Sequence, residues 1–282
     1  MSMPTLPIDC PTDATRPPSG SAIVFEDVHL AFEENQVLRG VSFQLPFGET
    51  KALFGVAGAG KSTILKLALG LVQPDSGKIT VLGFDVTQMR ERDLFPMRGR
   101  LGMVFQESAL FDSLTVRENV AYRLTEEHGI YDDDIDRRVR EALRFVELEH
   151  TLDLFPSELS GGMRRRVAIA RAIITHPELL LYDSPTGGLD PVTSNTIIEL
   201  IMKQRDVYKT SSLLVSHRLQ DAFTLATHQF DPTTSQVRAL PRGQYCDVPM
   251  SFLILRDGKV IFDGDVRQLA RTHDEYIREY IS

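Results

Sequence analysis

Apolar and polar residues alternate along the first part of the chain in short segments. Two stretches, AIVFEDVHLAF (22–32) and VSFQLPF (41–47), alternate regularly enough to predict half-buried antiparallel strands. A short apolar run at 50–56 ends in glycines, and residues 61–71 then carry apolar side chains at helical spacing. Further short apolar runs predict strands at 78–84, 101–105, 179–182 and 212–216.

The middle of the chain, from Thr115 to about Thr175, is predicted to be helical because apolar residues recur three or four apart. Pro191 opens another predicted helix, between the last two strands. Strands alternating with helices predict an α/β fold with a mostly parallel core sheet and helices on both faces. We expect an antiparallel β-subdomain before that sheet and an inserted helical subdomain at about 107–176. No internal repeat is visible, so we expect one domain, at 21–282.

Two segments depart from this pattern. Residues 1–20 are rich in Pro, Ser and Thr and are predicted to be a disordered tail. They lack the basic and apolar regions of a signal peptide, so we expect none. The segment at about 228–250, HQFDPTTSQVRALPRGQYCDVPM, is predicted to be a surface loop that contacts a partner or has no role. The chain end, after a predicted strand at 251–264, is expected to form short amphipathic helices.

Composition narrows the function classes. The 282 residues are 42% hydrophobic and 25% charged, typical of a globular protein with a sizeable core. The net charge of -8 argues against a nucleic-acid partner, because such a surface needs a basic face. No apolar stretch approaches the ~18 residues needed to cross a bilayer. Cys10 and Cys246 lie in unlike contexts without metal spacing, which indicates a reducing cytosol.

The sequence GVAGAGKST contains the strongest chemical signal. It fits G-x-x-x-x-G-K-[ST] between a predicted strand and a predicted helix, the context of a P-loop. Its glycines let backbone N–H groups converge on phosphate oxygens, and the helix adds its positive end. Lys61 is predicted to reach the β- and γ-phosphates of a nucleotide, and Ser62 to bind Mg²⁺. The predicted loop comprises Gly55, Val56, Ala57, Gly58, Ala59, Gly60, Lys61, Ser62 and Thr63.

Asp183 follows the apolar run LLLY at the predicted carboxyl end of a buried strand, where ligands bind in open α/β sheets. We therefore predict that its carboxylate is the second Mg²⁺ ligand. The segment ELSGGMRRRVAIARAI, at 158–173, places Ser160, Gly161 and Gly162 at the start of a helix, a position that favours an anion.

With these motifs together, residues from about 22 to 282 resemble the ABC-transporter ATPases, a family of P-loop NTPases. The resemblance implies that Phe32 stacks on adenine and that Gln106 contacts Mg²⁺ and the attacking water and senses the membrane subunit. It also implies that Asp190, in Gly188-Leu189-Asp190, lies in a loop crossing the dimer interface, and that His217 contacts the γ-phosphate. The alternatives for these residues are a core phenylalanine, a solvated loop glutamine, a turn and a structural histidine.

The family resemblance also implies partners. Two such domains pair head to tail, and the Ser160–Gly162 segment of one covers ATP on the phosphate loop of the other. A homodimer is expected, with a heterodimer as the alternative. Closure of the pair drives a transmembrane permease, so the chain is expected to be cytoplasmic, held at the inner face of the membrane. GMVFQESALFDSLTVRENVAYRL, with Met163, looks like Mce and Mla-type lipid transport ATPases, which implies an Mce-type lipid-binding protein as another partner.

One position departs from the family pattern. The residue after Asp183 is Ser184, where the family has a glutamate that polarises the attacking water. A hydroxyl has no useful basicity near neutral pH, and loss of a general base costs about 10²–10⁴-fold in rate. ATP binding is expected to persist, with weak hydrolysis assisted by His217 and Gln106. The alternatives are an ATP-binding switch that barely turns over, a heterodimer whose other subunit has an intact site, or a harmless variant with the base supplied elsewhere.

Overall fold

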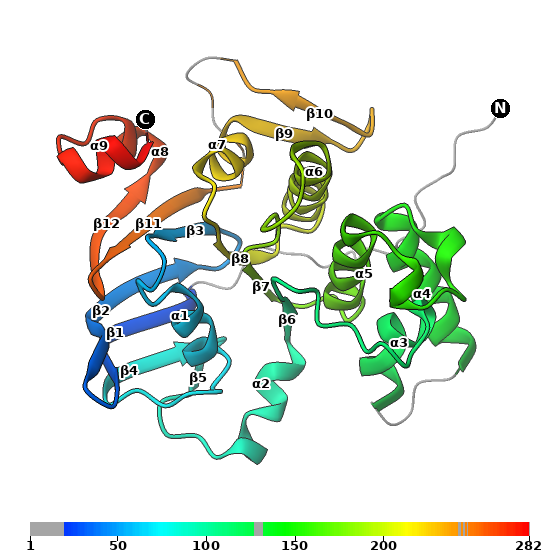
Figure 1. Cartoon of the computed structure of the whole chain (residues 1–282), viewed down its shortest axis with the longest axis horizontal. Coiled ribbons are helices and arrows are strands. Elements are labelled where there is room, and N and C mark those ends of the chain that lie inside the picture. Colours follow the sequence, from blue (N-terminus) through cyan, green and yellow to red (C-terminus); the bar gives the residue numbers. More distant parts are fainter. Residues whose placement is uncertain (1–19, 127–131, 242–243, 245, 247, 282) are drawn as a thin grey trace.

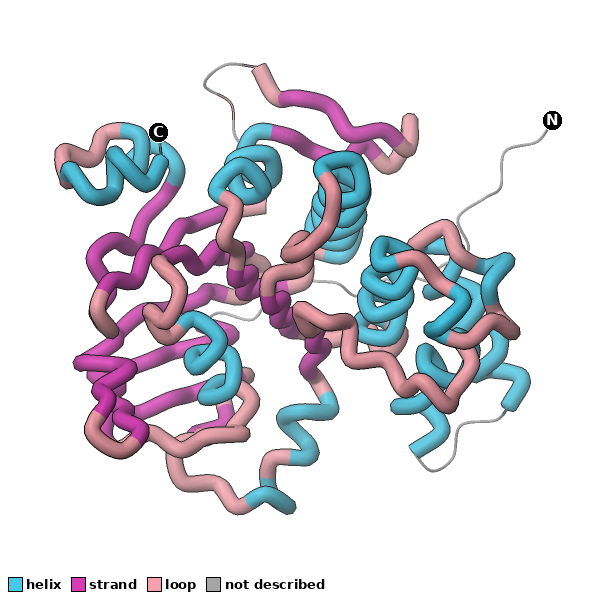
Figure 2. The backbone as a smooth tube through the Cα atoms, viewed as in Figure 1, coloured by secondary structure: helices cyan, strands magenta, loops and turns pink. Residues whose placement is uncertain are grey.

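The computed structural model describes residues 20–126, 132–241, 244, 246 and 248–281. The predicted disordered tail, apart from Gly20, lies outside the described residues. Strands gather on one side of the molecule and a block of helices on the other, joined through the central sheet (Figures 1 and 2).

The central sheet has six strands in the order β12-β11-β3-β8-β7-β6. Five of them run parallel, and β12 pairs antiparallel with β11 at one edge. The mostly parallel sheet predicted from the sequence is confirmed. Every residue of β3 and β8 is buried, which explains why these strands read as continuous apolar runs. The strands are β3 (Thr50–Gly55), β6 (Leu101–Val104), β7 (Leu179–Asp183), β8 (Ser211–Val215), β11 (Met250–Arg256) and β12 (Lys259–Asp265).

The expected antiparallel β-subdomain is present as a second sheet in the order β2-β1-β4-β5. Its alternating apolar side chains form one buried face, on which Phe25 and Phe43 stack with ring centroids 4.7 Å apart. This sheet comprises β1 (Ser21–Phe32), β2 (Asn35–Pro46), β4 (Ser76–Val81) and β5 (Phe84–Asp85).

Helices cover both faces of the central sheet because side chains of a strand alternate between the two. On β7, Leu179 and Leu181 join the core that contains α1 (Lys61–Ala68) and the antiparallel sheet. Leu180 and Tyr182 join the core on the other face, which contains α6 (Pro191–Tyr208). A third core packs α7 (Leu219–Thr227), α8 (Val266–Ala270) and α9 (Glu275–Ile281) against β11.

The helical block contains α3 (Val116–Glu126), α4 (Asp132–Phe145) and α5 (Gly161–Ile173), as the periodicity predicted. Its apolar faces share one core with β7 and α6, so the block is continuous with the sheet domain. The pattern missed α2 (Phe95–Gly99), a single short turn before β6. Three 3-10 turns, at Glu91–Asp93, Glu149–Thr151 and Pro156–Glu158, complete this region.

The segment predicted to be a surface loop contains instead a hairpin of β9 (His228–Asp231) and β10 (Gln236–Ala239). Polar groups of α6 hold it. The Asp206 carboxylate accepts bonds from the Phe230 amide, at 2.7 Å, and from the Cys246 thiol, at 3.4 Å. Arg205 pairs with Asp206 and donates to the His228 carbonyl at 2.9 Å. The loop prediction is wrong for these two strands. Phe230 is buried beside α6, and this packing holds β9 against the helix.

Candidate nucleotide site

The predicted phosphate loop joins the end of β3 to the start of α1 (Figure 1). Gly58 and Gly60 have φ angles of 80° and 95°, which only glycine adopts at little cost. A Cβ at Gly60 would also lie 2.8 Å from Leu38 Cδ2, so a larger residue would force Leu38 to move. Gly60 caps α1 without a side chain, which leaves the positive end of the helix to a bound anion.

Lys61 lies inside this loop. Its Nζ donates to the carbonyl oxygens of Gly55, at 2.8 Å, and Val56, at 2.9 Å. Burial lowers the pKa of Lys61, while the negative charge of Asp183 opposes that change. The ammonium group is therefore held at the loop by neutral acceptors and by one carboxylate, in a place from which it can bind phosphate oxygens.

Two of the three predicted metal ligands meet, although 121 residues separate them. The Ser62 hydroxyl donates to a carboxylate oxygen of Asp183 at 3.3 Å. His217 follows the end of β8 by two residues, and the charges of Lys61 and Asp183 act on its ring. Burial first, and then Lys61, lowers the pKa of His217, so the neutral imidazole is favoured at neutral pH.

These donors fit Mg²⁺ with a nucleotide. Mg²⁺ takes hard oxygen ligands and is usually bound by one or two carboxylates together with substrate phosphates. A hydroxyl and a carboxylate oxygen 3.3 Å apart supply that partial set. Within the described ranges, no group of three or more His, Cys, Asp or Glu residues could hold a metal without such help.

Ser184 occupies the turn after Asp183. Its φ of 46° is in the left-handed region, and its amide donates to the Val215 carbonyl at 2.9 Å. The side chain is 2% exposed, and its hydroxyl has no hydrogen-bond partner within the described part of the chain. The water-polarising position of the family pattern therefore holds a buried hydroxyl and no carboxylate.

Gln106 is exposed and lies beside this turn. A Cβ atom at Gly187 would be 3.7 Å from Gln106 Cγ and 3.4 Å from Ser184 Cβ. The structure therefore brings together Gln106, Ser184 and the start of the loop that leads to Asp190.

Ser160–Gly162 does not join this cluster within the chain, because α5 lies across β6 and β7 from α1 (Figure 1). Ser160 caps α5 by accepting from the Met163 amide at 3.2 Å. Asp190 caps α6, and its carboxylate accepts from the Val192 and Thr193 amides, both at 3.0 Å. Both side chains therefore cap helices within the chain. Ser160 and Asp190 also lie on neighbouring segments, since a Cβ at Gly161 would be 3.8 Å from Leu189 Cδ2.

Phe32 ends β1 and is 49% exposed, so the alternative of a core phenylalanine does not hold. It pairs with Asn35 across the hairpin turn, and this hairpin reaches the phosphate loop through the contacts of Val37 and Leu38 with Gly60. The exposed ring is thus available at the edge of the loop for an adenine base.

The similarity of this chain to known proteins agrees with the geometry of the site. The model of the ABC transporter family matches residues 38–187, which include the phosphate loop, the Ser160–Gly162 segment and Asp183. The chain belongs to the ABC transporter family. It is therefore the ATP-binding subunit of a transport system, and chains of this family act with membrane permeases and dimerise.

Two relatives differ in the transport named for them. The intermembrane phospholipid transport system ATP-binding protein MlaF of Haemophilus influenzae is 32% identical over 86% of this chain and 83% of its own length. The methionine import ATP-binding protein MetN of Bifidobacterium longum is 41% identical, over 64% of this chain and 44% of its own length. A solved dimer of the ATP-binding cassette MJ0796 with ADP and phosphate matches 87% of this chain and 99% of its own, with a TM-score of 0.71 and 26% identity. No helix in the described part of this ABC ATPase is long and apolar enough to cross a membrane.

Sequence reasoning missed two polar groups behind the site. Arg165 donates to backbone carbonyls around Ser184, and only its place in the arginine run 164–166 hinted at a role. Asp221 accepts a 2.5 Å bond from the Thr186 hydroxyl, and burial raises the pKa of its carboxyl group. No sequence motif marked that pair.

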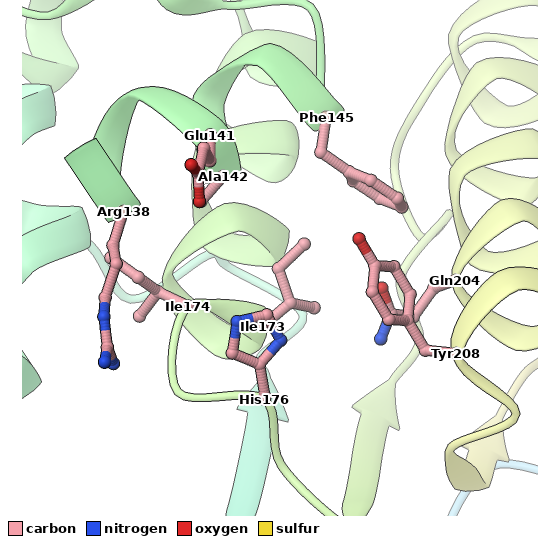
Figure 3. A pocket seen from close by; sticks show the side chains of 9 residues that line it. All are labelled: Arg138, Glu141, Ala142, Phe145, Ile173, Ile174, His176, Gln204 and Tyr208. Atoms are coloured by element: carbon pink, nitrogen blue, oxygen red, sulfur yellow. The ribbon is translucent and has the colours of Figure 1, made fainter. Parts of the chain in front are cut away.

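A cavity elsewhere in the molecule does not compete for the nucleotide. It lies between α4, the end of α5 and α6, where the rings of Phe145 and Tyr208 are 6.0 Å apart (Figure 3). Its volume of about 30 Å³ is far below the ~300–1,000 Å³ of a typical small-molecule site. The exposed face at the phosphate loop is therefore the candidate site for ATP.

Proposed function

We propose that this subunit binds Mg-ATP at the phosphate loop and drives transport of a lipid or another hydrophobic compound through a separate permease. The observation that carries the proposal is the convergence of Lys61, Ser62, Asp183 and His217 at the carboxyl ends of β3, β7 and β8. The lipid class rests on similarity to MlaF and on the Mce and Mla-like segment, because the fold of an ATPase does not by itself specify the cargo.

In this proposal the loop amides and Lys61 hold the β- and γ-phosphates, and Phe32 stacks on the base. Ser62, Asp183 and Gln106 would hold Mg²⁺, which neutralises charge on the phosphates when bound. His217, neutral because of burial and Lys61, would donate a hydrogen bond to the γ-phosphate. Positioning and electrostatics supply most of the rate in phosphoryl transfer, so these groups alone support slow hydrolysis without a carboxylate at 184.

Exposed apolar residues support the docking of a permease segment over α2 and α3. Phe95, on α2, and Tyr122, on α3, are 65% and 42% exposed, and Phe111 lies 4.6 Å from the Tyr122 ring. Arg123 joins the two helices by donating to the Arg98 carbonyl at 2.7 Å. Several large apolar side chains in water over adjoining elements are typical of an interaction surface.

A second candidate function is an ATP-dependent switch that closes but barely hydrolyses. The burial of Ser184 and the unpartnered state of its hydroxyl among the described residues favour it. In this case ATP would hold the two chains together until a partner releases them. A heterodimer whose other chain supplies an intact second site is the remaining alternative for the partner subunit.

The test purifies the tagged chain with the membrane fraction and reconstitutes the complex with fluorescent phospholipid in donor vesicles. We expect a polytopic membrane protein to co-purify and ATP to drive phospholipid transfer to acceptor vesicles. Phe95→Glu should lose the membrane protein while ATP binding by the isolated chain persists. Normal ATP binding without any membrane protein would favour the switch, and transfer of methionine but not phospholipid would refute the lipid class.

A further inference from the structure

Arg165 is a buried charged side chain on α5 that no assigned role explains. The residue is 5% exposed. Its guanidinium donates to three backbone carbonyls, those of Phe105, Ser184 and Gly187, each at 3.3 Å. Its Nε is buried and has no hydrogen-bond partner within the described part of the chain. Burial lowers the pKa of Arg165, and the charge of Glu107 opposes that change. A buried charge without a bonded carboxylate is costly, so its retention calls for a role.

The three acceptors belong to the three segments that meet at the attacking-water position. Phe105 precedes Gln106, Ser184 follows Asp183, and Gly187 begins the loop to Asp190. Bonds at 3.3 Å are longer than the 2.7–2.9 Å typical of charged donors, so a small shift of the guanidinium can exchange one for another. Arg165 therefore bridges these three segments.

α5 links this contact to the N-terminus of the same helix. Ser160 caps α5, and Arg165 follows five residues later, about 7.5 Å along the axis at 1.5 Å per residue. In the head-to-tail pair that the family resemblance implies, and on which the proposed function depends, Ser160–Gly162 would cover ATP held by the partner chain. A helix of 13 residues moves as a rigid body over so short a distance.

We propose that Arg165 is a positioning residue that couples the two ATP sites of the dimer. When Ser160–Gly162 engages the partner's nucleotide, α5 shifts and Arg165 moves the Phe105, Ser184 and Gly187 carbonyls of its own chain. Each site is then aligned for water attack only when the other is occupied. The proposal rests on the head-to-tail pairing of the proposed function, and Arg165 itself touches neither substrate nor metal.

The test compares Arg165→Gln and Arg165→Lys with a matched variant on the same helix, Arg166→Gln. Arg166 donates to the Val146 carbonyl at 3.1 Å and does not contact the site. The measurements are Mg-ATP binding by dilute chain, ATP-induced dimerisation by light scattering, and ATP turnover over a range of ATP concentrations. Thermal unfolding shows which variants are folded.

We expect Arg165→Gln to lower kcat about tenfold and the Hill coefficient towards 1, with KM and the ATP affinity of dilute chain within twofold of wild type. Arg165→Lys should recover part of the cooperativity, since one ammonium replaces three guanidinium bonds. Arg166→Gln should retain the wild-type Hill coefficient. If Arg165→Gln does not fold, the Lys variant carries the same comparison.

Two results separate the possible failures. Wild-type chain that binds no Mg-ATP or never dimerises would refute the proposed function, and the coupling with it. Wild-type chain that binds and pairs normally, with Arg165 variants that keep full cooperativity, overturns the coupling alone. An equal loss in Arg166→Gln would overturn it as well, because a general loosening of α5 would then explain both.

Discussion

Replacement of Ser184 by glutamate tests how much of the hydrolysis chemistry this chain lacks. A positioned general base contributes about 10²–10⁴-fold, or about 3–5 kcal/mol of barrier. Serine and glutamate share the strain of the left-handed backbone at 184, where φ is 46°, so that cost cancels in the comparison. The phosphate loop and the Ser62–Asp183 pair are unchanged, so Mg-ATP affinity should stay within about twofold.

Arg165 reduces the expected gain. Its guanidinium bonds the Ser184 carbonyl, so a carboxylate at 184 has a competing orientation in which it pairs with Arg165. If that orientation is favoured by about 1.4 kcal/mol, only about a tenth of the molecules present the carboxylate to the nucleotide. The expected increase in kcat is therefore about 10–10³-fold.

The assay measures phosphate release at saturating Mg-ATP, with Ser184→Gln as a control of the same length without charge. We expect the Gln variant to remain at the wild-type rate. An unchanged or lower kcat in Ser184→Glu, with ATP binding intact, would show that the missing carboxylate does not limit turnover. The base would then come from elsewhere, or a step other than chemistry would set the rate.

Three further predictions follow from the contacts described above. Lys61→Met should weaken Mg-ATP binding at least tenfold, since a charged hydrogen bond contributes about 1.5–3 kcal/mol. Titration calorimetry measures the affinity, and an unchanged value would show that Lys61 does not bind the nucleotide. Asp206→Ala should lower the free energy of unfolding, measured in urea, by about 3–5 kcal/mol. Arg205 would stay buried without its carboxylate, and β9 would lose the hydrogen bond from the Phe230 amide. A loss below about 1 kcal/mol would contradict this account. Burial raises the pKa of Cys246 from 9.0 to about 11. In a Cys10→Ser variant at pH 8, alkylation of Cys246 should therefore be about 100-fold slower in the folded protein than in the unfolded protein. Equal rates would refute the burial argument.

Local patterns predicted much of this fold. The alternation in 22–32 and 41–47 predicted β1 and β2, and helical spacing predicted α3, α4 and α5, since each depends on residues that are neighbours along the chain. The insertion at 228–250 was mispredicted because its Pro and Thr content favours a loop. The hairpin depends on Asp206 and Phe230, which are 24 residues apart. Local sequence propensity cannot predict a contact between residues so far apart along the chain.

By itself the sequence determined the phosphate loop, because turn geometry, glycine freedom and the helix end all arise within Gly55–Thr63. It also determined that residue 184 carries no carboxylate. Only the tertiary structure brought Ser62 within 3.3 Å of Asp183 and placed Arg165 against three carbonyls. Backbone carbonyls are the same at every residue, so a side chain that bonds to them leaves no mark on its partners in the sequence. Only the tertiary structure determines which backbone carbonyls such a side chain bonds.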